Sequence, residues 1–222
     1  KERILRGVLV NYSILLSEML EGTLNSLALF GLTLLFSLPL GLILCVGRRS
    51  KFKIINIPVK FYLLLLRGTP LMLQLMFVFY VVNPLLPFRI DRFPAAVVAF
   101  VLNYAAYFAE IYRGGMESIP VGQYEAANVL GFSKKQTFFK IILPQVIKRI
   151  LPPMGNEFIT LVKDTSLAKV ISVVELMKVT SDWANSAANF VPFIIAAIFY
   201  LVMNGVVSKC FSIAEKKLSY YR

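Results

Sequence analysis

Three long windows without a charged residue most strongly constrain what this chain can fold into. They are Gly22–Gly47, Gly68–Phe88 and Trp183–Ser208. At 1.5 Å per residue, each window can cross the roughly 30 Å hydrocarbon core of a bilayer as a helix. Hydrophobic residues make up 58% of the 222 residues, whereas a soluble domain carries about 45–50%. The sequence therefore predicts an all-α integral membrane protein.

Two weaker apolar regions complete the expected bundle. Phe93–Ala109 is a shorter charge-free window, and a region of about Ile150–Val179 is apolar but interrupted by charges. Counting both gives a polytopic bundle of five spanning helices. Residues 1–20 alternate charged with apolar side chains, which is typical of a helix lying on the outer interface. No repeat or second domain is visible, so residues 1–222 are expected to form a single transmembrane domain.

The second window has a start signal of its own. Thr69 followed by Pro70 is a favourable N-cap and first-turn pair. The spanning helix is therefore expected to restart at these two residues. The preceding stretch, which carries Lys60 and Arg67, is expected to be an interfacial lead-in.

The distribution of Lys and Arg predicts the orientation of the chain. Fourteen of these residues fall in the loops after the first and third spans and in the C-terminal tail, against five to seven on the opposite side. Because basic residues concentrate on the cytoplasmic side, the C-terminus is expected in the cytoplasm and the N-terminus outside. The first residues show no pattern of a cleavable signal peptide.

Several functional classes are disfavoured by composition. The chain has no His, and Cys45 and Cys210 have no metal-ligand spacing, so neither a metal site nor His-based catalysis is expected. The net charge of +12 comes from short clusters beside apolar runs, which does not indicate nucleic-acid binding. There is no Gly-x-x-x-x-Gly-Lys-Ser/Thr phosphate loop. The chain is therefore expected to bind no cofactor and to hydrolyse no ATP.

A polar stretch between the third and fourth spans has helix signals of its own. Pro120–Leu130 reads as a short helix ended by Gly131, which suits a left-handed cap. Ser133 and Gln136 form a capping-box pattern for a second helix, Lys134–Leu143, which Pro144 is expected to end. The result is a cytoplasmic helix–Gly–helix elbow over about residues 118–146. The alternative is an ordinary amphipathic loop.

The elbow carries a recognisable motif. It reads Glu-Ala-Ala, three residues, Gly, nine residues, Ile, one residue and Leu-Pro. This motif resembles the signature of the membrane (permease) subunits of type I ATP-binding-cassette importers. The stretches "GTLNSLALFG" (22–31), "RGTPLMLQL" (67–75), "NYAAYFAEIYRGGMESIPVGQYEAA" (103–127) and "NEFITLVKDTSLAKVI" (156–171) are similar to the polar amino-acid uptake branch of that family. The motif positions are Glu125, Ala126, Ala127, Gly131, Ile141, Leu143 and Pro144.

This resemblance implies a function and a set of partners. The elbow would be a coupling helix that docks on a separate ATPase subunit, which binds ATP and Mg²⁺ and does the hydrolysis. An identical or paralogous membrane subunit and an extracytoplasmic substrate-binding protein would complete an amino-acid importer of the bacterial plasma membrane. The alternative is a self-sufficient secondary transporter or channel for small polar solutes. A membrane-embedded enzyme is disfavoured by the lack of any nucleophile motif.

Polar residues inside the spans are candidates for the substrate path, because ionisable groups at membrane depth are costly. The prolines and Gly of "LPPMGNEF" and the capping residues after Lys163 predict a broken helix whose amides, from Leu167 on, would hold a carboxylate. The alternative for Asn103 and Tyr107 is interhelical hydrogen bonding and packing. The alternative for the segment around residue 164 is a plain loop on the outer side. The substrate candidates are Asn103, Tyr107, Met154, Gly155, Glu157, Asp164, Thr165 and Ser166.

Two further expectations concern charge. Glu110 lies just before Arg113, which favours an ion pair or gate over substrate contact. Glu157 precedes Asp164 by seven residues, and the family often has an uncharged amide at the Glu157 position. Two neighbouring acids favour a nearby cation, so the substrate is expected to be a cationic amino acid such as arginine, lysine or histidine.

Overall fold

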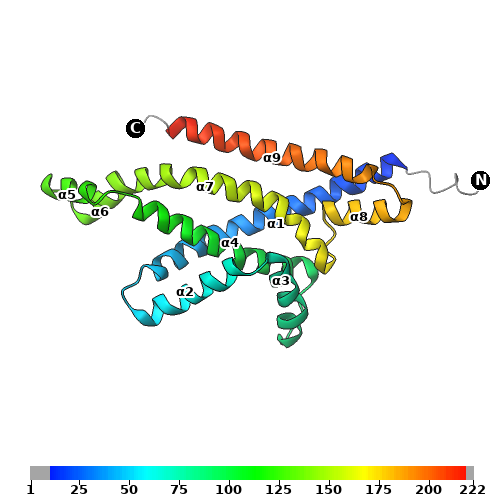
Figure 1. The fold of residues 1–222 in the computed structure, drawn as a ribbon, viewed down its shortest axis with the longest axis horizontal. Coiled ribbons are helices and arrows are strands. Elements are labelled where there is room, and N and C mark those ends of the chain that lie inside the picture. The colour runs from blue at the N-terminus through cyan, green and yellow to red at the C-terminus, as the bar shows by residue number, and fades with distance from the viewer. Residues whose placement is uncertain (1–10, 219–222) are drawn as a thin grey trace, which may run out of the picture. The chain divides into compact units, whose positions relative to one another are not determined.

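The structure is a computed structural model that describes residues 11–218, and every regular element in that range is helical (Figure 1). Short π and 3-10 helices join several of the longer α-helices. The elements are α1 (Tyr12–Arg48), α2 (Lys53–Gly68), α3 (Leu71–Met76), η1 (a π-helix, Phe77–Val82), η2 (a 3-10 helix, Asn83–Leu85), α4 (Arg92–Glu117), α5 (Val121–Val129), α6 (Lys134–Gln136), η3 (a π-helix, Thr137–Ile142), α7 (Leu143–Asp164), η4 (a 3-10 helix, Thr165–Ile171), α8 (Leu176–Ala187) and α9 (Val191–Leu218).

Three of these helices are long and apolar enough to cross a membrane. They are α1, α4 and α9, and a fourth span results if α2 and the helical segment Leu71–Leu85 count as one interrupted span. The expected all-α membrane protein is thus confirmed at this level. Helix α7 has 22 residues but a more polar sequence, and it is not among these candidates.

Three expected boundaries are wrong. The expected interfacial helix over residues 1–20 is not a separate element in its described part, because α1 runs from Tyr12 without a break into the first apolar window. Residues 1–10 lie outside the described residues. Trp183 belongs to α8, and the last span begins only at Val191. The region Ile150–Val179 is divided among α7, η4 and α8. Hydropathy alone does not reveal the turn that separates η4 from α8.

The expected restart after residue 68 is present, but its capping differs. Helix α3 begins at Leu71 and has Pro70 as its N-cap residue, with no side-chain cap. The Thr69 hydroxyl instead donates a hydrogen bond of 2.8 Å to the carbonyl of Leu65 in α2. Thr69 therefore provides a hydrogen-bond donor for a carbonyl at the end of α2, instead of capping the start of α3. The sequence pair Thr-Pro does not distinguish these two roles.

The residues group into two compact units. The first holds the chain up to Leu34, Pro70–Val101 and Thr160–Gly205. In it, α3 packs on η4, and α1 approaches the start of α8 so closely that a Cβ at Gly22 would lie 3.0 Å from the amide nitrogen of Leu176. The side chain of Asn83 closes the following loop through two hydrogen bonds of 2.8 Å to the backbone of Ile90.

The second unit holds Leu35–Thr69, Leu102–Ile159 and the chain from Val206 onward. One of its core clusters is formed by Cys45, Leu63, Ala106 and Ala109, which are all buried. Small residues allow α1 and α4 to pack tightly here, since a Cβ at Gly41 would lie 2.9 Å from the Cβ of Phe108. This unit contains the whole of the elbow, which is therefore described together with the helices that hold it.

Candidate functional site

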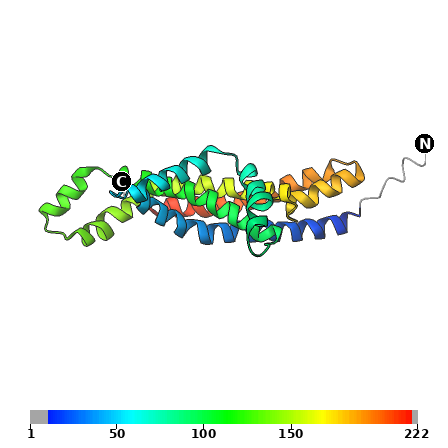
Figure 2. The same cartoon turned by 90° about the horizontal axis from the view of Figure 1, so that it is seen from below.

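The elbow turns at a glycine-centred helix end. Gly131 has φ +76°, the left-handed region that glycine adopts without strain. The N–H of Phe132 donates to the carbonyl of Ala127 at 3.0 Å, and the N–H of Gly131 donates to that of Asn128 at 3.0 Å. This pair of bonds is a Schellman motif. The expected glycine stop is confirmed, and Figure 2 shows the two arms of the elbow in green on either side of the turn.

The second arm begins with the expected capping box. The N–H of Gln136 donates to the hydroxyl of Ser133 at 3.3 Å, and the N–H of Ser133 donates to the side-chain carbonyl of Gln136 at 2.9 Å. Two amides that a helix start leaves without partners are thereby satisfied. Because both signals act over a few residues, the turn region is fixed by local sequence.

The expected end of this arm at Pro144 is wrong. The chain runs from α6 through the π-helix η3 directly into α7, with Pro144 at the second position of α7. An α-helix would bring the proline ring against the carbonyl four residues earlier. The wider π turn, in which the N–H of Leu143 donates to the carbonyl of Phe138, accommodates the proline. The elbow is therefore joined to α7 by a continuous helix.

The base of the elbow is packed between α4 and α7. Ile119, Ile142 and Val146 form a buried apolar cluster. A Cβ at Gly115 would overlap the Cγ2 methyl of Ile150, so only glycine allows the two helices to come this close. The Arg149 guanidinium also donates to the carbonyl of Ser118. These contacts attach the base of the elbow to both α4 and α7.

The motif residues divide between the surface and the interior of the elbow. Glu125, Ala126 and Gly131 are exposed, whereas Ala127, also on α5, is buried. Ile141, Leu143 and Pro144 are half-buried where η3 meets α7. Next to the exposed motif residues, Val129 and Leu130 are 86% and 72% exposed. The first arm thus presents a small apolar surface with one carboxylate.

A charged cluster in the second unit surrounds Glu110. Its carboxylate accepts from the Arg113 guanidinium at 2.7 Å, and it lies 3.6 Å from a guanidinium nitrogen of Arg67 and 3.8 Å from one of Arg48. The expected ion pair with Arg113 is present, and its gating role stays a prediction. Arg48 and Arg67 were not predicted as members of this cluster, although each lies in the last turn of an apolar helix, where a cation is favourable.

The substrate candidates of the second unit make helix–helix contacts. The side-chain amide of Asn103 donates to the carbonyl of Leu66 at 3.1 Å. The Arg67 guanidinium lies 5.6 Å from the ring centre of Tyr107, a cation–π distance. These contacts correspond to the interhelical alternative for both residues.

Two candidates on α7 also lie in this unit beside apolar side chains. Met154 is buried. A Cβ at Gly155 would lie 3.0 Å from the Phe211 ring, so the glycine serves packing against α9. The third, Glu157, is half-buried. A substrate role for these residues stays a prediction.

The expected helix break at Asp164 is wrong. Asp164 has αR backbone angles (φ −66°, ψ −23°), and α7 changes into η4 there without an interruption. Thr165 is buried, and its hydroxyl donates to the carbonyl of Val162 at 2.8 Å. Asp164 and Ser166 are half-buried. No separate half-helix starts at Leu167, because η4 runs through it and Asp164 gives no side-chain cap.

A buried polar cluster around Glu175 was not predicted. Glu175 is 0% exposed and is the N-cap of α8, accepting from the N–H of Lys178 at 2.7 Å and of Met177 at 2.8 Å. Its carboxylate also lies 3.4 Å from the Tyr200 hydroxyl and 3.5 Å from that of Ser26. The Tyr200 hydroxyl further interacts with the side chains of Thr165 and Ser166. Three helices of the first unit, α1, α8 and α9, therefore meet at one acid.

Burial raises the pKa of Glu175 to about 7, and the N–H groups of Met177 and Lys178 oppose that rise. The residue lies in the turn before α8, outside the candidate spans. The one sequence signal for it is an acid immediately before an amphipathic helix. Its partners in α1 and α9 are too distant in sequence to be inferred.

Comparison with known proteins assigns the chain to a family. Residues 37–220, which include the elbow, match the family described as the inner membrane component of binding-protein-dependent transport systems. The chain belongs to this family of permeases. The alternative of a self-sufficient secondary transporter or channel is therefore wrong, since this family depends on a binding protein.

Individual relatives cover most of the permease. It is 38% identical over 192 residues to the L-cystine transport system permease protein TcyB of Bacillus subtilis, covering 86% of this chain and 82% of that protein. It is also 38% identical over 200 residues to the arginine transport system permease protein ArtQ of the same organism, covering 90% and 91%. A solved amino acid ABC transporter, crystallised with histidines, superposes with a TM-score of 0.84 at 33% identity over 94% of this chain and 96% of that one.

Proposed function

We propose that this permease is the translocation subunit of an ATP-driven amino-acid importer of the bacterial plasma membrane. Its relatives are named as permeases for L-cystine and arginine, and the solved amino acid transporter has the same fold across nearly the whole chain. The chain itself is not an enzyme in this proposal. ATP and Mg²⁺ bind to a separate ATPase subunit, and an extracytoplasmic binding protein delivers the amino acid.

The elbow carries the proposal. Its first arm exposes Glu125 and Ala126, while a Schellman turn and a capping box fix the backbone between its arms. An alanine surface permits close approach of a partner, and the carboxylate accepts hydrogen bonds at the contact. The continuous helix from η3 into α7 then passes a displacement of the ATPase to the membrane helices.

The topology follows from the same proposal. Helices α1, α4 and α9, the interrupted segment from α2 to Leu85, and α7 together form five spans. The N-terminus lies outside and the elbow and C-terminus lie in the cytoplasm, as the Lys and Arg distribution predicts. Five spans are few to enclose a pathway, so a second membrane subunit, identical or paralogous, completes it.

The substrate is proposed to be a cationic amino acid. Glu157 and Asp164 lie seven residues apart on α7, which is helical throughout, so both carboxylates project from one side of the helix. Two acids on one side of a helix favour a cation beside them. Asn103, Tyr107, Met154 and Gly155 of the second unit, and Thr165 and Ser166 of the first, are the further proposed substrate residues.

Elbow variants test the coupling role in proteoliposomes with the ATPase and the binding protein. Glu125→Lys reverses the charge of the docking surface, and Gly131→Leu forces a bulky residue to φ +76°. Both are expected to abolish substrate-stimulated ATP hydrolysis and uptake. Gly122→Ala is the matched control on α5, because a Cβ there meets no atom within 4 Å. Normal stimulated hydrolysis in both elbow variants would remove the coupling role.

The cationic substrate has its own test in the same vesicles. Glu157→Gln keeps the size of the side chain and removes its charge. Arginine uptake is expected to fall about tenfold, the effect of about 1.4 kcal/mol of lost charge attraction, while glutamine uptake changes little. An equal loss for both amino acids would reject the cationic assignment and leave the importer assignment intact.

A further inference from the structure

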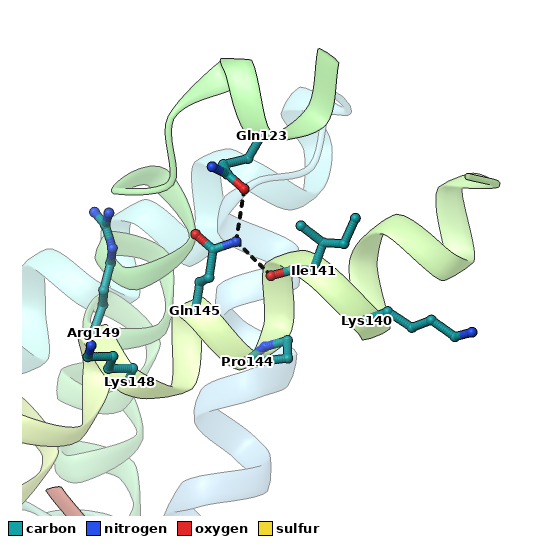
Figure 3. A pocket seen from close by; sticks show the side chains of 7 residues that line it. All are labelled: Gln123, Lys140, Ile141, Pro144, Gln145, Lys148 and Arg149. Atoms are coloured by element: carbon teal, nitrogen blue, oxygen red, sulfur yellow. Dashed lines mark hydrogen bonds between the residues drawn. The ribbon is translucent and has the colours of Figure 1, made fainter. Parts of the chain in front are cut away.

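The depression where the elbow joins α7 is polar, but its charged groups do not converge. Figure 3 shows Lys140 pointing to the opposite side from Lys148 and Arg149, so a single small ligand does not meet all three cations. The Gln145 side-chain amide is already bound to the side-chain carbonyl of Gln123 at 3.2 Å. The buried polar cluster of the first unit differs, because its groups meet at one carboxylate.

The directions of the hydrogen bonds in that cluster follow from the carboxylate of Glu175. An ionised carboxylate only accepts hydrogen bonds. Glu175 accepts from the N–H groups of Met177 and Lys178, and the Tyr200 hydroxyl donates to it at 3.4 Å. A phenol has one proton to donate. The Tyr200 oxygen can therefore only accept from its other neighbours.

Two of those neighbours are hydroxyl side chains of η4. The Tyr200 hydroxyl interacts with the side chains of Thr165 and Ser166. Thr165 gives its one proton to the carbonyl of Val162 at 2.8 Å, so Ser166 is the donor to Tyr200. The Ser166 oxygen then keeps lone pairs for a further donor. Ser166 is half-buried whereas Thr165 is buried, so Ser166 is the one of the two that a ligand can reach.

Ionisation of Glu175 keeps this order of donors and acceptors. Burial raises the pKa of Glu175 to about 7, and the backbone N–H groups, the Tyr200 hydroxyl and the Lys169 cation oppose that rise. At about pH 8, above this value, the carboxyl group is mostly ionised and accepts only. The chain of hydroxyls from Ser166 through Tyr200 to Glu175 then has one direction.

We propose that Tyr200, held by Glu175, is a positioning residue that turns the lone pairs of Ser166 toward the α-ammonium group of the transported amino acid. This inference rests on the transport function proposed above, in which Ser166 is a substrate residue. An ammonium group donates hydrogen bonds and accepts none. The acids Glu157 and Asp164 on α7, which leads into η4, favour the same positive charge. Tyr200 acts through Ser166 and does not contact the substrate.

The test is equilibrium binding at the same pH to the permease–ATPase complex in nanodiscs, with radiolabelled arginine as the probe. Tyr200→Phe keeps the ring and removes the hydroxyl. It is expected to bind arginine about tenfold more weakly, the effect of one hydrogen bond to a charged group. δ-Guanidinovaleric acid, which is arginine without its α-ammonium group, is expected to lose little affinity. An equal loss for both ligands would overturn the proposal.

A double-mutant cycle shows whether Tyr200 acts through Ser166. Ser166→Ala is expected to weaken arginine binding about as much as Tyr200→Phe. The double variant is expected to bind no more weakly than Ser166→Ala alone, because the two residues act as one unit. Additive losses would show that Tyr200 acts independently of Ser166 and would overturn the proposal, as would unchanged binding in Tyr200→Phe.

Ser26→Ala is the matched control, because the Ser26 hydroxyl lies 3.5 Å from the same carboxylate but belongs to α1. The change removes the acceptor of the Leu176 N–H. Its melting temperature is therefore expected to fall, while its arginine binding stays close to that of the wild type. Melting curves check that every variant is folded. Equal losses of binding in Ser26→Ala and Tyr200→Phe would mean a general loosening of the cluster and would reject the positioning role.

Uptake in proteoliposomes with the binding protein separates this inference from the transport function. Arginine uptake by the wild type, together with normal binding by Tyr200→Phe or no binding to the complex at all, would remove the positioning role and leave the importer assignment intact. If the wild type takes up glutamine but not arginine, the cationic substrate is rejected. Glutamine and its analogue without the α-ammonium group, glutaramic acid, then replace the two ligands in the same cycle.

Discussion

The elbow and the polar cluster around Glu175 use the same kinds of side chain in opposite ways. In the elbow, Ser133 and Gln136 satisfy the backbone within three residues of themselves, and the outer face stays exposed. Around Glu175, the acid itself is buried and its partners come from α1, α8 and α9. Local hydrogen bonds make a small unit that keeps its shape while presenting a surface. Long-range ones tie distant segments into one core.

The largest expected effect is at the centre of the polar cluster. Glu175→Ala removes the cap of α8 and leaves the amides of Met177 and Lys178 without their acceptor. The expected loss is about 3 kcal/mol in the free energy of unfolding, combining a lost cap with buried unsatisfied donors. The midpoint of thermal or denaturant unfolding in detergent measures it.

Glu175→Gln sharpens the same comparison through pH. The folded pKa of Glu175, about 7, lies above the ordinary glutamate value of 4.5, so the native carboxyl holds a proton that the unfolded one has released. The free energy of unfolding of the wild type is therefore expected to decrease as the pH rises from about 4.5 to about 7. Glu175→Gln cannot ionise, so its free energy of unfolding is expected to lack this decrease. A variant as pH-dependent as the wild type would contradict the assignment.

A medium effect is expected at the base of the elbow, where local and long-range packing meet. Gly115→Ala places a methyl group against Ile150, and the overpacking is expected to cost about 1–3 kcal/mol of unfolding free energy. Gly114→Ala is the control on the neighbouring position, where an added Cβ meets no atom within 4 Å. That change is expected to stabilise α4 by up to about 1 kcal/mol, because Ala is the better helix former.

Equal melting temperatures for the two glycine variants would show that α4 and α7 are not in close contact at this point. In that case the elbow would be connected to the membrane helices only through its own chain. Opposite shifts support the description of a packed base.

The smallest effect is expected inside the elbow. Ser133→Ala removes one hydrogen bond of the capping box and is expected to destabilise the second arm by about 1 kcal/mol. The change should raise amide hydrogen exchange in residues 134–142 and leave the global unfolding midpoint nearly unchanged. Ser133→Thr keeps the acceptor and is the control. A drop of the global midpoint as large as that of Glu175→Ala would contradict the contrast between the two regions.

The sequence by itself determined the membrane character, the stop at Gly131 and the capping box at Ser133 and Gln136. Each of these depends either on bulk transfer of apolar residues out of water or on bonds between residues at most five positions apart. It also contained the motif by which the family is recognised. These signals need no knowledge of which helices are neighbours.

Only the tertiary structure decided the features that depend on neighbouring helices. It gave Asn103 a partner in Leu66, placed Glu110 among Arg48, Arg67 and Arg113, and buried Glu175. Ser26 and Leu176 are 150 positions apart, yet the Leu176 N–H donates to the Ser26 hydroxyl at 3.3 Å. A buried polar group takes whichever partner packing brings within reach, since leaving it without one costs free energy. No sequence period encodes that choice.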